Sequence, residues 1–305
     1  MKRISYNYSK VLLICALVSI FVIVQTINTF GAEVTNHTPG EFQVGQNGSA
    51  TYTIPIKVPP GINGLEPNLS LEYNSGIKNG LLGMGWSLNG ISTITRGPST
   101  LMTDGFIDGV DFDEDDRFYL NGKRLIIANE DQGYQYGDPG AEYRTEIDEF
   151  SKVITIGTAG TGPQYFEVWL KNGFKLYFGN SADSRIEAQG KDSVLIWAVN
   201  RIEDLNGNYM TVSYFEDNEN GVFRPNRIDY ALNNNADLVN ACSVCFYYEP
   251  RIDDVPKYVS GSVIHISERL SEVQTYVNDV LIRKYHLEYE YGEVGHASAQ
   301  ERGRP

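Results

Sequence analysis

Most of the chain alternates hydrophobic and polar residues with the two-residue period of β-strands. The clearest example is 165–178, where alternate positions are apolar on both sides of Asn172-Gly173. Asn-Gly tolerates the positive φ angles that tight hairpin turns require. This segment is therefore predicted to form a β-hairpin.

The same period recurs along the chain. It predicts a strand over 52–58, a hairpin over 118–127, strands over 194–202 and 209–215, and a strand over 281–291. No long window has the 3.6-residue period of an amphipathic helix. We therefore expect an all-β fold of consecutive antiparallel hairpins. The Gly-rich segment 157–163 is a candidate sub-boundary, and the tail 293–305 is expected to be irregular.

The N-terminus has a different pattern. Three basic residues in the first ten precede a 14-residue apolar run at 11–24, and small residues follow at Thr29 and Gly31. This is typical of a secretory signal peptide over 1–32, cleaved near Gly31 or Ala32. An uncleaved anchor is the alternative, but a spanning helix needs about 20 apolar residues. We expect a secreted protein with no membrane span after cleavage.

Charge and cysteine content narrow the possible functions. The chain has 25 Lys+Arg and 39 Asp+Glu, a net charge of −14, which disfavours a nucleic-acid partner. Cys15 lies in the signal segment. Cys242 and Cys245 are three residues apart on a predicted strand, so they face opposite sides about 10 Å apart. That separation exceeds the reach of a disulfide, so we expect two inert thiols.

An acidic stretch offers the one candidate metal site. Its seven carboxylates are Asp104, Asp108, Asp111, Asp113, Glu114, Asp115 and Asp116. Asp111, Asp113 and Asp115 begin like a calcium-binding EF-hand loop. The match then ends, because Asp116 replaces the expected Gly and Gly122 replaces the expected Glu. A calcium site and a solvated acidic loop both remain possible interpretations.

Motifs for catalysis are incomplete. Ser87 lies in Gly-Trp-Ser-Leu-Asn-Gly, which departs from the nucleophile pattern G-x-S-x-G at Asn89. None of the four histidines has a local triad context. The glycines of 157–162 are not followed by Lys-Ser/Thr or by a helical pattern, so they do not form a phosphate loop. We expect no catalytic site and no cofactor.

Residues 45–125 carry a longer pattern. It consists of Gly48-Ser-Ala-Thr-Tyr52, Ile54-Pro-Ile-Lys-Val-Pro-Pro-Gly61, Gly64-Leu-x-Pro-x-Leu-Ser-Leu-x-Tyr-Asn-Ser-Gly76, Asn79-Gly-Leu-Leu-Gly-Met-Gly-Trp-Ser-Leu-x-Gly90, Ile94-Thr-Arg96 and Asp115-Asp-Arg-Phe-x-Leu-x-Gly122. This pattern resembles the N-terminal region of the Salmonella virulence plasmid B protein (SpvB) family, which also opens the B components of insecticidal toxin complexes (Tc toxins). Later strands fit the same family, so the resemblance covers about 40–291.

The resemblance implies an architecture and partners. In toxin-complex B components this region begins a large β-structured shell with RHS-type (YD) repeats, which encloses a toxic region and docks onto a translocation channel. In the virulence plasmid protein, the enzyme is a separate C-terminal ADP-ribosyltransferase domain. No residue of this chain matches that domain. The resemblance thus assigns 33–292 to a β-sandwich or shell-like region.

Several residues of the shared pattern have a structural interpretation. Pro-Pro-Gly ends a strand and fixes a turn, and glycines near Trp86 permit tight backbone around that ring. The residues concerned are Pro59, Pro60, Gly61, Gly83, Gly85, Trp86 and Gly90.

Three functions are compatible with these observations. The favoured one is a non-catalytic structural component of a secreted virulence or insecticidal-type toxin protein. Its partners would be further shell repeats and a toxin cargo or translocation component. The alternative is a free-standing secreted module that binds glycan or a host protein through exposed Tyr or Trp side chains. An enzyme using Ser87 or the acidic residues is the least favoured.

Overall fold

The computed structural model describes residues 40–45, 47–236, 242–254, 256–291 and 303–304. Strands dominate these residues, which confirms the all-β prediction. The helical segments among them are α2 (Leu101–Asp104), η1 (Glu130–Gln132) and η2 (Ala182–Ser184). No helix in this described part has the length and apolar character needed to cross a bilayer. The predicted signal peptide and cleavage site, and most of the tail, lie outside the described residues.

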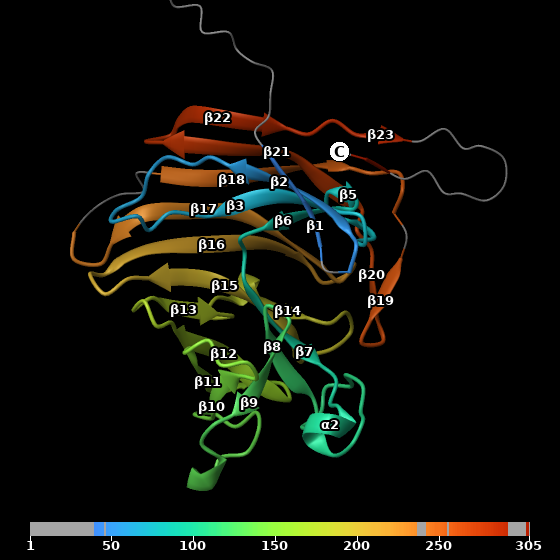
Figure 1. Cartoon of the computed structure of the whole chain (residues 1–305), viewed down its shortest axis with the longest axis vertical. Coiled ribbons are helices and arrows are strands. Elements are labelled where there is room, and N and C mark those ends of the chain that lie inside the picture. Colours follow the sequence, from blue (N-terminus) through green and yellow to red (C-terminus); the bar gives the residue numbers. More distant parts are fainter. Residues whose placement is uncertain (1–39, 46, 237–241, 255, 292–302, 305) are drawn as a thin grey trace, which may run out of the picture. The chain divides into compact units, whose positions relative to one another are not determined.

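Eight antiparallel strands close into a barrel, in the lower part of Figure 1. Neighbours in sequence pair in order from β7 to β13, and β15 closes the ring by pairing with both β13 and β7. The barrel strands are β7 (Thr93–Gly97), β8 (Arg117–Leu120), β9 (Lys123–Ile127), β10 (Glu142–Thr145), β11 (Lys152–Ala159), β12 (Gly162–Trp169), β13 (Lys175–Phe178) and β15 (Val194–Glu203).

The sheet continues beyond β15 as an open antiparallel sheet in the order β15-β16-β17-β18-β21-β22. A short strand, β14, also pairs with β15. These strands are β14 (Arg185–Glu187), β16 (Asn208–Asp217), β17 (Val222–Asn233), β18 (Cys242–Pro250), β21 (Glu268–Val277) and β22 (Val280–His286).

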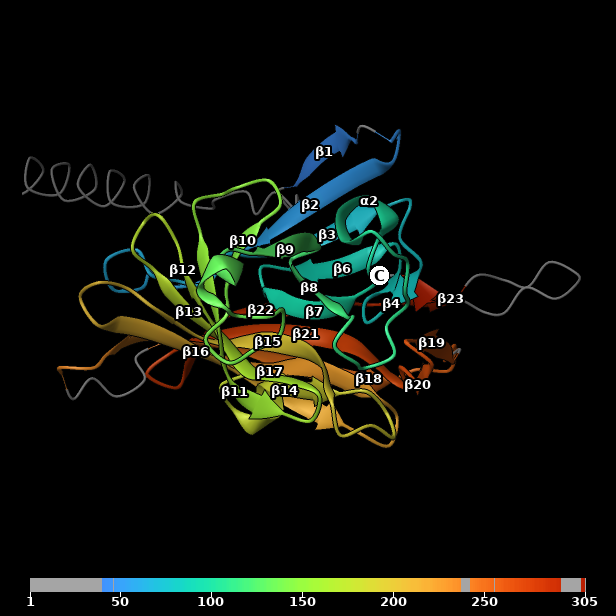
Figure 2. The same cartoon turned by 90° about the horizontal axis from the view of Figure 1, so that it is seen from below.

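A second sheet packs on one face of this open sheet (Figures 1 and 2). Its order is β1-β2-β3-β6. Leu69 and Leu71 of the second sheet are buried in one hydrophobic cluster with Tyr230 and Val244 of the open sheet, so the two sheets form a β-sandwich. The remaining strands belong to the second sheet or to three two-stranded pairs: β1 (Glu41–Val44), β2 (Ala50–Ile56), β3 (Leu69–Asn74), β6 (Trp86–Asn89), β4 (Asn79–Gly80) with β5 (Gly83–Met84), β19 (Lys257–Val259) with β20 (Ser262–Ile264), and β23 (Glu290–Tyr291) with β24 (Gly303–Arg304).

Both hairpins predicted from Asn-Gly turns are confirmed. The β8–β9 hairpin turns at Asn121-Gly122, and the β12–β13 hairpin turns around Asn172-Gly173. Asn121 and Gly122 have φ angles of 49° and 77°, as a two-residue type I′ turn requires. Local turn chemistry therefore sets the register of these barrel strands.

In three segments the observed strands differ from those predicted from the sequence. The strand predicted over 281–291 stops at His286, and pairing resumes only at β23. The segment 157–163 is the tip of the β11–β12 hairpin, where Thr158 still pairs with Pro163, so strand pairing continues through it. Within the expected irregular tail, β24 pairs with β23.

The barrel interior contains a group of aromatic side chains among aliphatic ones. Trp197 on β15 is 0% exposed, and its ring meets those of Phe118 and Phe166 edge-on, with centroids 5.5 and 5.0 Å apart. Its Nε1–H donates to the carbonyl of Pro163 at 3.1 Å. Trp86, by contrast, is half-buried on β6. Of these two tryptophans, only Trp197 is therefore fully buried.

We expect Trp197→Ala to lower the free energy of unfolding by about 3–5 kcal/mol, the usual cost of truncating a buried aromatic residue. Trp86→Ala should cost less, because part of its ring is already in contact with water. Urea denaturation of both variants, followed by circular dichroism, measures the difference. A larger loss for Trp86→Ala would contradict this ranking.

Candidate functional site

The acidic loop between β7 and β8 uses two of its carboxylates for structure. Asp116 is buried and accepts a hydrogen bond from Arg96 Nη1 at 2.8 Å. Asp104, at the end of α2, accepts from Arg117 Nε at 2.7 Å and from Arg124 Nη2 at 2.6 Å. Burial raises the pKa of Asp116, against the effect of Arg96. At Asp104, burial is outweighed by backbone and arginine hydrogen bonds, which lower its pKa.

Three other acids of the loop come together. Oxygens of Asp108, Asp111 and Asp113 all lie within 4.8 Å of one another. Desolvation and the neighbouring carboxylates raise the pKa of Asp111. Asp115 instead forms a local turn, in which its N–H donates to Asp113 Oδ1 at 2.8 Å. The structure thus gathers Asp111 and Asp113, with Asp108 in the place expected for Asp115, and calcium binding there stays a prediction.

Ser87 lies on β6, beside β3 in the four-stranded sheet. Its Oγ donates to a backbone carbonyl of β3 at 3.4 Å. Within the described part of the chain, His265 pairs with Asp254 at 3.2 Å and His286 pairs with Glu272 at 3.4 Å, and neither is a hydrogen-bond partner of Ser87. The geometry therefore gives Ser87 no general base from these two histidines.

The two C-terminal cysteines lie on β18 as free thiols. Cys242 is buried in the sandwich core, and burial raises the pKa of its thiol. Cys245 is half-buried, with Arg227 Nη1 at 3.6 Å from its sulfur. Their different surroundings agree with the opposite faces that the three-residue spacing predicts.

The residues predicted to shape turns border the four-stranded sheet. Gly61 donates its N–H to Glu66 Oε2 at 2.8 Å, and a Cβ there would lie 2.0 Å from the carbonyl oxygen of Leu65. Gly90 has a φ of 104°, and its Cβ would lie 2.1 Å from the oxygen of Asn68. Only glycine fits these two positions. The other members of the set are Pro59 and Pro60 after β2, Gly83 and Gly85 at φ angles of 83° and 81°, and Trp86 on β6.

A pair of glutamates was not apparent from the sequence. Glu187 on β14 and Glu216 on β16 interact, although they are far apart in sequence. Burial and the carboxylate of Glu187 raise the pKa of Glu216 to about 7. Its Oε1 is buried with no hydrogen-bond partner. No local motif could reveal this pair, because it depends on both strands lying beside β15.

Free strand edges are a further feature. Among the described strands, β22 pairs only with β21 and ends the open sheet. Val280 and Ile282 on it are 62% and 54% exposed, and Leu281 between them is also exposed. The sequence signal for this edge is the run of three apolar residues, because an alternating strand cannot bury all three on one face.

The acid pair makes stability depend on pH. Because the pKa of Glu216 is higher in the folded than in the unfolded state, folded protein binds the proton more tightly, and stability falls as pH rises from about 4.5 to about 7. We expect Glu216→Gln to remove this part of the decline and to be more stable than the parent at pH 8. Urea unfolding between pH 5 and 8 measures the free energy of unfolding of both proteins. Glu219→Gln is the control, because Glu219 is exposed. Parallel stability curves for Glu216→Gln and the parent would contradict the assignment.

Comparison with known proteins gives a family and a fold. Residues 44–242 match the family described as Salmonella virulence plasmid 65kDa B protein. A comparison with curated protein sequences found no match.

Solved structures share the fold. A crystal structure of TcdB2-TccC3 is similar, with a TM-score of 0.67 and 19% identity over 83% of this chain. This chain spans 15% of that one. The structure of the Photorhabdus luminescens Tc holotoxin pore, with the TccC3-D651A mutation, is similar with a TM-score of 0.63 and a sequence identity of 18%. The match covers 83% of this chain and 15% of that chain.

A third similar structure is the N-terminal domain of effector protein SpvB from Salmonella typhimurium strain LT2. Its TM-score is 0.61 and its identity 20%, over 78% of this chain and 93% of that domain. The family match covers more than half of the sequence, and these structures share the fold over 78% to 83% of this chain. The chain therefore belongs to the Salmonella virulence plasmid 65kDa B protein family.

Proposed function

We propose that this chain is a non-catalytic structural component of a secreted, toxin-related protein, and that it forms one end of a larger β-structured shell. The observation that carries the proposal is the edge of β22, which has no second partner among the described strands and leaves Val280, Leu281 and Ile282 exposed. An exposed edge offers unpaired N–H and C=O groups to another strand. Its exposed apolar side chains would be removed from water by the same pairing.

The protection on this edge is uneven. Arg283 and Lys284 occupy the second half of β22, and the register with β21 shifts between Arg283 and Leu281, beside Ile282. Charged residues and bulges are the usual devices that prevent edge pairing. The first half of the strand lacks such charges and is protected only by the register shift beside Ile282, so a partner strand is favoured at that end.

The relatives suggest what the partner would be. The chains named TcdB2-TccC3 are several times longer than this one, and a related structure is a holotoxin pore. By analogy, further shell repeats would cover the edge, and a toxin cargo or translocation component would complete the assembly. The match to the N-terminal domain of an effector supports a role apart from catalysis. Export through the predicted signal peptide would place the protein outside the producing cell.

The edge can be tested on the mature chain, residues 33–305. We expect this protein to self-associate, and Leu281→Lys/Ile282→Lys to weaken association by placing like charges along the edge. Analytical ultracentrifugation over a concentration series measures the change. Leu205→Lys is the matched control, because Leu205 is 83% exposed in the turn between β15 and β16.

A parent protein that stays monomeric and melts cooperatively would contradict the shell proposal. That result would favour the free-standing module that binds glycan or a host protein. The intact mass of the naturally secreted species separates the two functions further. A species limited to this mature chain favours the module, and a larger species containing it favours the shell.

A further inference from the structure

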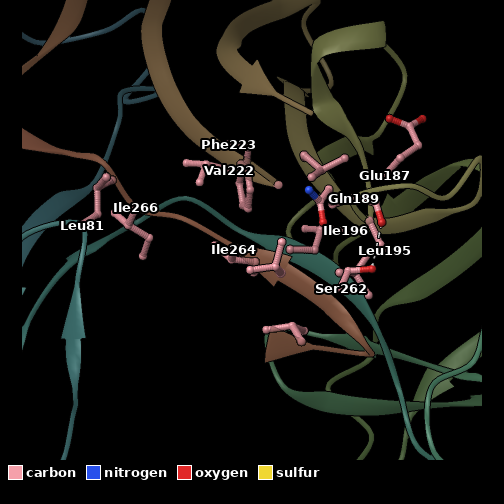
Figure 3. A pocket seen from close by; sticks show the side chains of 15 residues that line it. Leu81, Glu187, Gln189, Leu195, Ile196, Val222, Phe223, Ser262, Ile264 and Ile266 are labelled. Atoms are coloured by element: carbon pink, nitrogen blue, oxygen red, sulfur yellow. Dashed lines mark hydrogen bonds between the residues drawn. The ribbon is translucent and has the colours of Figure 1, made fainter. Parts of the chain in front are cut away.

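An apolar pocket of about 180 Å³ lies between β14, the start of β17 and β20. We call it the seam pocket, and Figure 3 shows the side chains around it. It is lined mainly by aliphatic and aromatic carbon, including Ile186, Leu195, Val222, Phe223, Ile264 and Ile266. These residues come from β14, β15, β17 and the β20 segment, which are separate in the sequence, so the pocket exists only in the folded protein.

The β19–β20 hairpin forms one wall of the seam pocket. Ser262 Oγ donates to the carbonyl of Gln189 at 3.1 Å, and the N–H of His265 donates to the carbonyl of Asn220 at 2.9 Å. Gly221 allows the hairpin to approach closely, since a Cβ there would lie 2.5 Å from the oxygen of Val263. The wall is thus held by specific contacts at both ends of β20.

Polar groups at the rim are already engaged. Gln189 Nε2 donates to the carbonyl of Glu219 at 2.8 Å, and Ser262 donates to Gln189. Figure 3 shows the carboxylate of Glu187 directed away from the cluster of apolar side chains. A water molecule in a cavity needs two to four polar partners, and this lining offers few.

The volume and lining together define a ligand class. Apolar cavities of about 150 Å³ stay dry and bind benzene or xenon. The lining atoms of an empty cavity lose dispersion contacts, which an apolar guest restores. A charged or strongly polar guest would lose its hydration without gaining hydrogen bonds.

We propose that the seam pocket binds one small neutral apolar molecule, an aromatic ring or branched aliphatic group of about six to nine non-hydrogen atoms. The guest lies between β14 and Phe223, with the β19–β20 hairpin as one wall. This site goes beyond the structural function proposed above and does not depend on it.

Benzene is the probe for the test, used with the mature chain. We expect a saturable rise in Tm of about 3 °C at ten times the dissociation constant. Methyl resonances of Ile264 and Leu195 should shift in the same titration. A Tm and methyl spectrum unchanged at saturating benzene would overturn the proposal.

Filling the pocket provides the specific variant. Ala188 is buried in the pocket wall, and Ala188→Leu should abolish the benzene-induced rise in Tm. The matched control is Ala128→Leu, at an exposed position after β9, which should keep the full response. An equal benzene response in Ala188→Leu and the parent would place binding elsewhere and contradict the proposal.

Enlarging the pocket covers the case in which Ala188→Leu does not fold. Ile264→Ala removes three carbons from the lining, so naphthalene should bind more tightly than it does to the parent, while benzene should bind more weakly. Unchanged preference between the two probes would count against the seam pocket as the site.

Discussion

The fold depends on β15, a strand that pairs with four other strands. The first half of β15 pairs with β7 and β14, and its second half pairs with β13 and β16. The strand therefore belongs both to the closed barrel and to the open sheet of the sandwich. Trp197 lies where the neighbours of β15 change from β7 and β14 to β13 and β16. Its indole is hydrogen-bonded to Pro163 inside the barrel. Fixing this side chain orders the barrel and the adjoining sheet together.

Buried ion pairs set the conformation of the acidic loop. Arg96 lies inside the barrel, where its guanidinium is 5.7 Å from the ring centre of Trp197 and bonds to Asp116. Removing two charges from water costs several kcal/mol for each ion, so such a pair contributes more to a specific geometry than to stability. Asp104 is held in a similar way by Arg117 and Arg124. Of the loop's remaining acids, Asp111 and Asp113 are exposed and Asp108 is half-buried.

The sequence was sufficient for features whose cause is local. Asn121-Gly122 determines its own turn, and the alternating pattern beside it determines two strands. Barrel closure could not be predicted this way, because it rests on the pairing of Trp197 with Ile94, about one hundred residues away. The Gly-rich surroundings of Trp86 indicate a tight backbone around its ring. The burial of a ring, however, depends on which face of the sheet is covered.

The same limit applies to the candidate sites. Asp115 fits the spacing of a metal loop, but its turn with Asp113 depends on backbone geometry, and Asp108 takes its place in the cluster. Glu187 and Glu216 have no sequence signal, since their interaction requires β14 and β16 to flank one strand. Sequence spacing therefore identified two of the three clustered acids, Asp111 and Asp113, but not Asp108.

The barrel and the sandwich differ in whether their outer strands have a free edge, and this difference is relevant to function. The barrel pairs every one of its strands on both sides, so it offers no edge for another chain. The sandwich leaves β22 and β1 each with one neighbour among the described strands, and both carry exposed apolar side chains. A protein that only needed stability would gain by closing the second half as it closes the first. Under the proposed function, the open half is where further strands would extend the sheet.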